Sequence, residues 1–372
     1  MNRALSRLAE GYAQMFGKAP VKPERADFTQ TAWDLLTFKK TPAERVRRKA
    51  AIKLEREEEA HAPPTVKWRN RRWASIIVLN LAFVLSFYFD LQLIEGALTA
   101  SRIFGFHFAD LNSALQVSLA FKTILINLVI GTVTVILIYF LIGGRTFCSW
   151  VCPYHLVSEW GEMLHLKLVK KGWAKDHPLH RGTRSVLFVV FAALAFVSGY
   201  TVFETISPVG ILSRAMTYGV VGGLIWVALL LLVEVFYSRR FWCRYVCPMG
   251  LTYGMTAAVA PIRIKYDGDF CLHEGKCREV CLVPHVLDIT KFGYSKDVQA
   301  PIGPDCTRCA MCLDACPTGA LSFDIKGFSK PAVDRRKLRD EQKKAVEEAN
   351  AAAAAKAAAR GKPVPAQAED EE

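Results

Sequence analysis

The sequence lacks an apolar run in its first 72 residues, and it lacks a Cys-x2-Cys-His motif anywhere in its 372 residues. The first absence argues against a secretory signal peptide, so the N-terminus is expected to stay in the cytoplasm. The second argues against a covalently attached c-type haem. Acidic residues are also few, with 35 Asp and Glu against 48 Lys and Arg, which leaves a formal net charge of +13.

The excess basic charge lies beside apolar segments. Of the basic residues, 17 precede Trp73 and seven more lie from Arg145 to Arg184. Positive charge at the ends of apolar runs is typical of the positive-inside bias of membrane proteins. We therefore expect no nucleic-acid partner.

Hydrophobic residues make up 52% of the chain, and four apolar segments approach the roughly 20 residues that a membrane-spanning helix needs. They are residues 73–89, 123–144, 185–203 and 215–233. The first is short, and its continuation DLQLI is expected to supply the missing turn. The basic connections place both termini on the cytoplasmic side of a bacterial inner membrane.

Composition divides the chain into four parts. They are a basic cytoplasmic segment (1–72), a four-helix transmembrane domain (73–260), an α+β ferredoxin-like domain (261–330) and an Ala-rich charged cytoplasmic tail (331–372). In the first part, ERVRRKAAIKLEREEE predicts a helix that either lies on anionic lipid or is solvated.

The transmembrane domain contains a tandem repeat. RTFCSWVCPY follows the second apolar segment, and RRFWCRYVCPM follows the fourth. Cys148 and Cys152 recur 95 residues later as Cys243 and Cys247. Two parallel hairpins suggest a pseudo-two-fold axis along the membrane normal, which would bring the two cysteine pairs together beneath the bundle.

Within each pair the thiols are four residues apart, which on one helix places them on the same face. Disulfides are rare in a reducing cytoplasm. Three interpretations remain: small buried residues at helix ends, a dithiol relay, or a shared tetrathiolate site for iron or an iron–sulfur cluster. We favour the shared site, because the motif is repeated.

The strongest motif is CTRCAMCLDACP, which contains Cys306, Cys309, Cys312 and Cys316. This is the spacing of a bacterial ferredoxin segment, whose fourth cysteine binds the other cluster of a two-cluster domain. Zinc sites instead pair two separated Cys-x2-Cys knuckles. The motif therefore predicts a 4Fe-4S cluster.

A second segment, CLHEGKCREVC, supplies Cys271, Cys277 and Cys281, with Glu274 where a cysteine is expected. By the usual crossover, Cys281 completes the first cluster and Cys316 joins Cys271 and Cys277 in the second. The second cluster is expected to be 4Fe-4S or 3Fe-4S, with Glu274 or water on one iron. The alternatives are that it is absent and that Glu274 is a surface residue.

Together these motifs resemble the NapH family, including its MauN-like members, of ferredoxin-type quinol-dehydrogenase membrane subunits. The likeness covers about residues 70–325 and includes FETISPVGILSRA and CREVCLVPHVL. A partial likeness extends to NosR and CcoG, which are expected to carry an extra periplasmic domain. The resemblance implies quinol oxidation and electron delivery through a partner iron–sulfur or cytochrome subunit.

Quinol oxidation releases protons, so a carboxylate near the headgroup region is expected. Asp90 and Glu204 stand at the outer ends of the first and third predicted helices, and we take them as candidates for proton handling.

We expect an iron–sulfur electron-transfer subunit between the quinol pool and an anaerobic respiratory or periplasmic reductase system. The alternative is a metal or cofactor reductase that matures another redox enzyme.

Overall fold

The computed structural model describes residues 3–18, 20–61, 66–90, 94–103, 105–326 and 328. The chain divides into two compact units, Met1–Gly327 and Phe328–Glu372. The predicted Ala-rich tail lies outside the described residues, and everything that follows concerns the first unit.

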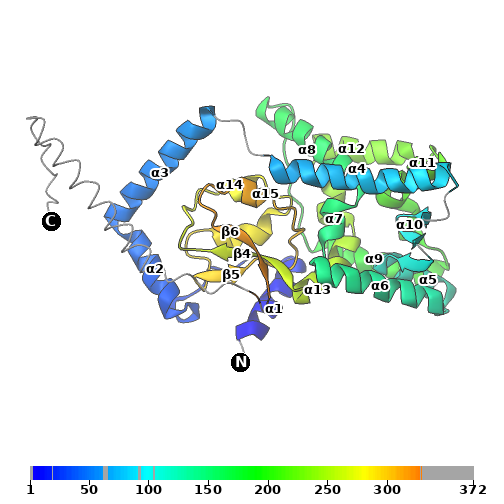
Figure 1. Ribbon diagram of the computed structural model, residues 1–372, viewed down its shortest axis with the longest axis horizontal. Coiled ribbons are helices and arrows are strands. Elements are labelled where there is room, and N and C mark those ends of the chain that lie inside the picture. Colours follow the sequence, from blue (N-terminus) through cyan, green and yellow to red (C-terminus); the bar gives the residue numbers. More distant parts are fainter. Residues whose placement is uncertain are drawn as a thin grey trace, which may run out of the picture. The chain divides into compact units, whose positions relative to one another are not determined.

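The first unit is rich in helices (Figure 1). Among the described helices, α4 (Lys67–Tyr88) alone is long and apolar enough to cross a membrane by length and composition. Shorter apolar helices are α5 (Leu111–Phe121), α6 (Ile126–Ile142), α9 (Thr183–Ser198) and α12 (Leu224–Phe236). The prediction of four long membrane-spanning helices is therefore not confirmed by the described residues.

The first apolar helix gains its length at its N-terminal end, so the expectation for DLQLI was wrong. Trp68 donates its backbone N–H to Asp314 Oδ2 at 2.8 Å, which places an acidic group at the positive end of α4. After Tyr88 the chain turns at Asp90, whose φ is 48°, and continues as β1 (Ile94–Ala97). This strand forms an antiparallel sheet with β2 (Ala100–Ile103) and β3 (Phe106–Ala109).

The prediction of one helix over residues 215–233 was also wrong, because the chain between 208 and 236 forms two helices. Helix α11 (Pro208–Tyr218) ends at Gly219, which has a φ of +71°, and α12 begins at Leu224. A left-handed glycine after the last turn terminates a helix because it carries no Cβ. The third predicted span is likewise divided into α9 and the short α10 (Val202–Ile206).

The two repeats pack reciprocally. Helix α8 (Pro153–Lys170), which follows the first motif, packs on α12, which leads into the second motif. Helix α13 (Met249–Val259), which follows the second motif, packs on α6, which leads into the first. In the same way, α4 of the first repeat packs on α11 of the second, and α9 of the second repeat packs on α5 of the first. Reciprocal contacts of this kind are what a pseudo-two-fold axis produces.

Neither cysteine pair lies on one continuous helix, which corrects the same-face argument. Cys148 is in the short α7 (Thr146–Trp150), whereas Cys152 precedes α8 with extended backbone. Cys243 is in a π-helical turn (Trp242–Val246), and Cys247 follows it, also extended. Proline restricts the preceding residue to extended conformations, so each Cys-Pro step ends its helix at the second cysteine.

The segment predicted to be ferredoxin-like, residues 261–330 and called the ferredoxin module below, forms in its described part a small antiparallel sheet with strand order β5-β4-β6 and short connecting helices. Its elements are β4 (Ile262–Asp267), α14 (Lys276–Glu279), η3 (Pro284–Thr290), β5 (Gln299–Pro301), α15 (Met311–Asp314) and β6 (Leu321–Ile325). Cysteines form part of its core together with Ile264, Tyr266 and Leu287.

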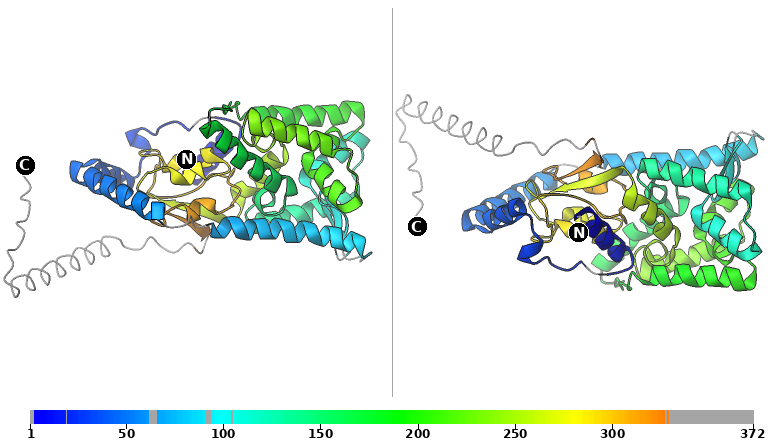
Figure 2. Two further views of the ribbon diagram at one scale, coloured as in Figure 1. Left: turned by 90° about the horizontal axis from the view of Figure 1, so that it is seen from above. Right: turned by 90° about the horizontal axis from the view of Figure 1, so that it is seen from below.

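The N-terminal segment contacts this module through Thr29 and Lys39, while the described side chains of the helix predicted from ERVRRKAAIKLEREEE are exposed or half-buried. It comprises η1 (Arg25–Asp27) and the helices α1 (Arg3–Met15), α2 (Gln30–Lys40) and α3 (Pro42–His61). Helix α1 packs on α13, and Met15 is 1% exposed. Figure 2 shows α1, in dark blue, beside the yellow module when seen from below.

Candidate metal centres

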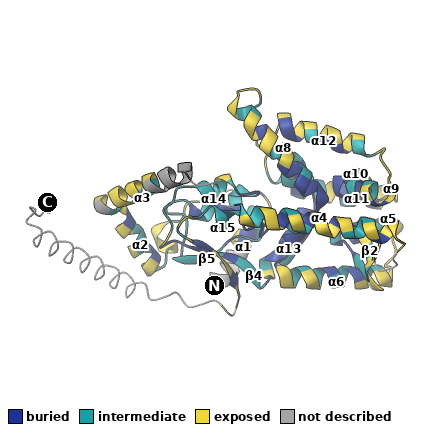
Figure 3. Ribbon diagram, turned by 45° about the horizontal axis from the view of Figure 1, so that its top comes forward, coloured by how far each residue is buried: buried dark blue, intermediate teal, exposed yellow. Residues whose placement is uncertain are grey.

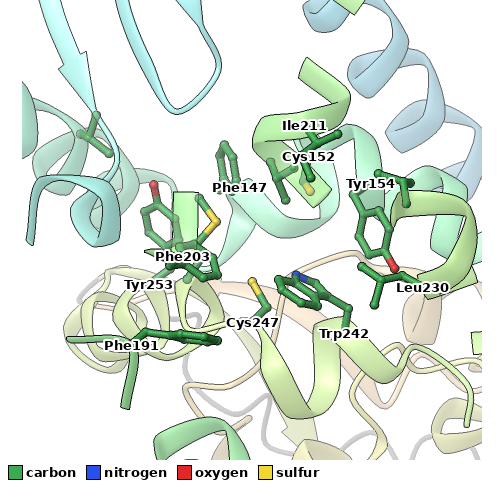
Figure 4. Packing of buried hydrophobic residues seen from close by; sticks show 14 residues of the cluster. Phe147, Cys152, Tyr154, Phe191, Phe203, Ile211, Leu230, Trp242, Cys247 and Tyr253 are labelled. Atoms are coloured by element: carbon green, nitrogen blue, oxygen red, sulfur yellow. The ribbon is translucent and has the colours of Figure 1, made fainter. Parts of the chain in front are cut away.

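The four cysteines of the tandem motifs line a single cavity of about 250 Å³. Cys148 and Cys152 come from the first repeat and Cys243 and Cys247 from the second. Figure 4 shows Cys152 and Cys247 within the same cluster of buried side chains as Phe147 and Trp242. The reciprocal packing of α8 and α13 therefore brings together thiols that are 95 residues apart in the sequence.

The cavity is strongly basic. Six arginines line it: Arg145, Arg181, Arg184, Arg239, Arg240 and Arg244. The Nε atoms of Arg145 and Arg184 and the Nε1 atom of Trp242 are buried without a hydrogen-bond partner. Buried donors are normally satisfied, so the residues present fit an anionic group at this place.

A buried ion cluster connects the cavity with the ferredoxin module. Asp305 accepts from Arg145 Nη1 at 2.5 Å and from Arg184 Nη2 at 3.1 Å, and its Oδ2 atom lies 2.8 Å from His285 Nε2. Burial alone would raise the pKa of Asp305, but the two guanidiniums and His285 hold it well below its ordinary value. Because Asp305 precedes Cys306, this carboxylate ties the motif arginine of the first repeat to the ferredoxin segment.

Two of the cysteines of the cavity, Cys152 and Cys247, are buried and the other two are half-buried, and helix starts point at the buried pair. Burial raises the pKa of Cys148, although the Arg145 guanidinium acts in the opposite direction. Burial also raises the pKa of Cys152 and Cys247. At Cys152 the backbone N–H groups opening α8 donate to the sulfur, and those opening α13 do the same at Cys247. These dipoles favour a thiolate once a metal compensates the burial.

Residues between the cysteines of the first motif bind the ferredoxin segment directly. Ser149 Oγ donates to the carbonyl of Thr307 at 2.7 Å, and Trp150 Nε1 donates to that of Arg308 at 3.1 Å. Arg308 in turn donates to the carbonyl of Ala257 in α13 at 3.1 Å. Sequence reasoning did not assign these residues or Asp305 a role, because nothing local marks a contact between segments more than 150 residues apart.

The first predicted ligand group is assembled. Cys281, Cys306, Cys309 and Cys312 line one small pocket of the ferredoxin module. Its wall also includes Thr307, which lines the basic cavity as well, so the two sites are neighbours.

The second predicted group is assembled from distant segments too. After the larger effect of burial, Cys316 raises the pKa of Cys271, and Cys271 and Cys316 both raise the pKa of Cys277, so the three side chains lie near one another. His273 N donates to Cys271 Sγ at 3.3 Å, and Thr290 Oγ1 lies 3.7 Å from Cys277 Sγ. Hydrogen bonds to sulfur are among the features that set the potential of an iron–sulfur cluster.

Glu274 is not a surface residue. Its side chain is 7% exposed, and neither carboxylate oxygen has a hydrogen-bond partner. Lys276 Nζ lies 3.7 Å from its Oε2 atom. The residues on either side, His273 and Gly275, have left-handed backbone with φ of 60° and 95°. A buried carboxylate needs compensation, and a metal ion would supply it.

Within the described residues, no group of three or more His, Cys, Asp or Glu side chains is close enough to hold a single metal ion. Thiolates of an iron–sulfur cluster each bind a different iron and so form a wider group.

The two proposed proton-handling residues have different surroundings. Asp90 is exposed at the end of α4. Glu204 is half-buried in α10, where its carboxylate accepts from the hydroxyl of Ser113. Near it lies Asp110, which sequence reasoning missed; it accepts from the Tyr253 hydroxyl at 2.6 Å, and burial raises its pKa to about 6. Asp110 caps the N-terminus of the apolar α5, and this role accounts for an aspartate at that position without requiring burial. The sequence therefore did not indicate that Asp110 is buried.

Comparison with known proteins identifies the family. The sequence profile of a 4Fe-4S binding domain matches residues 124–172 and 220–265, which are the two repeats. MauN, a methylamine utilization ferredoxin-type protein of Methylorubrum extorquens, is 30% identical over 268 residues, covering 70% of this chain and 90% of that protein. The ferredoxin-type protein NapH of Haemophilus influenzae is 31% identical over 199 residues, covering 53% and 68%. NapH of Escherichia coli is 29% identical over 270 residues, covering 70% of this chain and 92% of that protein.

The chain belongs to the NapH and MauN family of ferredoxin-type proteins. The predicted resemblance is confirmed, and this family member is an iron–sulfur electron-transfer protein with a 4Fe-4S binding domain. No solved structure matches it. The two matched segments contain the four thiols of the basic cavity and none of the cysteines from Cys271 onward.

Proposed function

We propose that this NapH/MauN family member is a membrane-bound subunit that passes electrons between the quinol pool and a partner redox complex. The observation that carries the proposal is the basic cavity, where thiols of both repeats meet Asp305 of the ferredoxin module. An electron carrier at this place would stand between the apolar bundle and the ferredoxin ligands.

Exposed apolar side chains support four membrane crossings, although three of the helices are short. Leu137 on α6, Val189 on α9 and Ile225 on α12 are 57%, 63% and 72% exposed. Figure 3 shows exposed residues along the outward faces of α4, α6 and α12. Apolar surface of this kind needs lipid or a partner to cover it. With the basic connections inside, both termini and the ferredoxin module face the cytoplasm of a bacterial inner membrane.

The ferredoxin module supplies two ligand sets. The first is Cys281, Cys306, Cys309 and Cys312, for a 4Fe-4S cluster. The second is Cys271, Cys277, Cys316 and Glu274, for a 4Fe-4S or 3Fe-4S cluster. Bound clusters supply one-electron redox chemistry, while the protein holds the sulfurs and sets the surrounding charge. The carboxylate of Glu274 is buried and accepts no hydrogen bond from the described residues, which supports its place among the ligands.

The four thiols of the basic cavity form the third ligand set, for an additional iron–sulfur site. The arginines would compensate the negative charge of four thiolates, and the helix starts at Cys152 and Cys247 add to this effect. The match of a 4Fe-4S domain to these two segments supports this assignment.

Glu204 is the better candidate for accepting a quinol proton, and Asp90 remains a second one. The neighbouring Asp110 gives Glu204 a buried carboxyl group to exchange protons with, whereas no such group is described beside Asp90. Electrons would then leave through a partner iron–sulfur or cytochrome subunit.

Iron analysis and electron paramagnetic resonance (EPR) on anaerobically purified protein test the assignment. Menaquinol and ubiquinol are expected to reduce the clusters. Cys148→Ser should remove the signal of the cavity site and keep those of the ferredoxin module. Cys312→Ser should remove the signal of the first cluster of the module and keep those of the second cluster and of the cavity site. Unchanged iron content and electron transfer in Cys148→Ser would refute the cavity site. Copper binding by its four thiols, without quinol-linked reduction, would favour the maturation-factor alternative.

A further inference from the structure

A lysine from the N-terminal segment is buried against the second ligand group. Lys39, near the end of α2, is 7% exposed. Its Nζ donates to the carbonyl of Gly268 at 2.6 Å and to that of Cys271 at 2.8 Å. Lysine is among the residues least often buried, so this placement needs a reason.

Contacts along the whole segment hold this lysine in place. Thr29 N donates to the carbonyl of Lys296 at 3.0 Å, and Lys296 Nζ meets Glu10 Oε1 at 2.7 Å. Beyond α2, the guanidinium of Arg48 lies 5.2 Å from the ring centroid of Phe292. The segment is thus anchored to the module on both sides of Lys39.

The charges around Lys39 define its electrostatic role. The nearby groups are Cys271 and Asp269 of the module and Arg48 and Glu44 of α3. Burial lowers the pKa of Lys39, whereas Cys271 and Asp269 act to raise it. The two carbonyl acceptors favour the ammonium form, and burial keeps water from screening its charge.

We propose that Lys39 raises the reduction potential of the cluster held by Cys271, Cys277 and Cys316. Reduction adds one negative charge to a cluster, and a buried cation beside a ligand stabilises that form. This inference rests on the second ligand set of the proposed function. It names a residue that shifts the reduction potential of the cluster held by that set, and it gives the N-terminal segment a role.

The expected effect is large enough to measure. At an effective dielectric constant of about 20, a unit charge roughly 10 Å away changes a one-electron equilibrium about tenfold. For a one-electron couple, tenfold corresponds to about 59 mV.

The test is an EPR-monitored redox titration of the full-length protein and two variants. Lys39→Met removes the charge and keeps most of the side-chain volume. Lys40→Met is the matched control, because Lys40 is the next residue of α2 but is exposed. The potential of the second cluster is expected to fall by about 59 mV in Lys39→Met and to stay unchanged in Lys40→Met. Iron content, measured in parallel, should equal that of the parent protein.

A second cluster that is retained in Lys39→Met at its original potential would overturn the inference. If Lys39→Met loses the cluster, Lys39→Gln carries the test, since an amide still donates to the carbonyls without a charge. A lowered potential in Lys39→Gln supports the inference; an unchanged potential, or loss of the cluster here too, overturns it. Absence of any second cluster in the parent protein would instead refute the proposed ligand set.

Discussion

Replacing Asp305 with Asn tests whether the buried ion cluster holds the ferredoxin module on the bundle. In the parent protein the carboxylate is shared by Arg145, Arg184 and His285, and the side chains of the two arginines are each 4% exposed. Asn keeps the shape and one acceptor oxygen but removes the charge. Two buried guanidiniums would then lose the carboxylate that they share, and removing one partner of a buried ion pair typically costs about 3–5 kcal/mol.

Denaturant unfolding of the detergent-solubilised protein, followed by tryptophan fluorescence, measures this loss. Asp176→Asn is the control, since Asp176 is 32% exposed and meets Arg239 Nε at 3.2 Å. Exposed ion pairs contribute about 0–1 kcal/mol, so the control should differ little from the parent. An Asp305→Asn variant as stable as Asp176→Asn would refute the reasoning.

The same contact predicts a pH dependence. Because the pKa of Asp305 is depressed in the folded protein, its stabilisation is complete above the unfolded value of about 4. It is lost as the pH falls from there through the folded value. The difference in unfolding free energy between the parent and Asp305→Asn should therefore be constant from pH 5 to 7 and shrink only below about pH 4.

Three further changes test other parts of the molecule. Glu204→Gln is expected to slow quinol-dependent cluster reduction at least about tenfold while dithionite reduction is unaffected; equal rates in stopped-flow absorbance would exclude Glu204 as the proton acceptor. Glu274→Cys should change the EPR signal of the second cluster alone, and an unchanged spectrum would remove Glu274 from its ligands. Gly144→Ala should destabilise the protein by several kcal/mol more than Gly172→Ala in the same unfolding assay: both glycines have positive φ, but a Cβ at Gly144 would lie 2.3 Å from the Cα of Ala257 whereas Gly172 has open space. Equal losses would mean that the backbone conformation, not crowding, decides the cost.

Much of the chemistry could be predicted because ligand spacing is a local property of the chain. A ferredoxin segment is predicted by the separation of Cys306, Cys309 and Cys312 alone. In the structure these three residues line one pocket together with Cys281. The family was confirmed for the same reason, since its motifs are short and contiguous.

Helix boundaries were predicted less well, because apolar composition does not reveal where a helix stops. Gly219 ends α11 inside a segment that is apolar throughout. The proline after Cys152 was visible, yet the same-face argument for the thiols treated the residues before it as one helix, although proline disfavours the helical conformation at the residue it follows.

The sequence by itself determined which side chains are available for redox chemistry and that the motif occurs twice. Only the tertiary structure decided that the two motifs share one basic cavity, because that depends on α8 crossing to α12 and α13 crossing to α6. Only it placed Asp305 between the motif arginine and the ferredoxin segment, and Lys39 against Cys271. These contacts join residues 160 and 232 positions apart, where packing and electrostatics rather than local chain geometry select the partner.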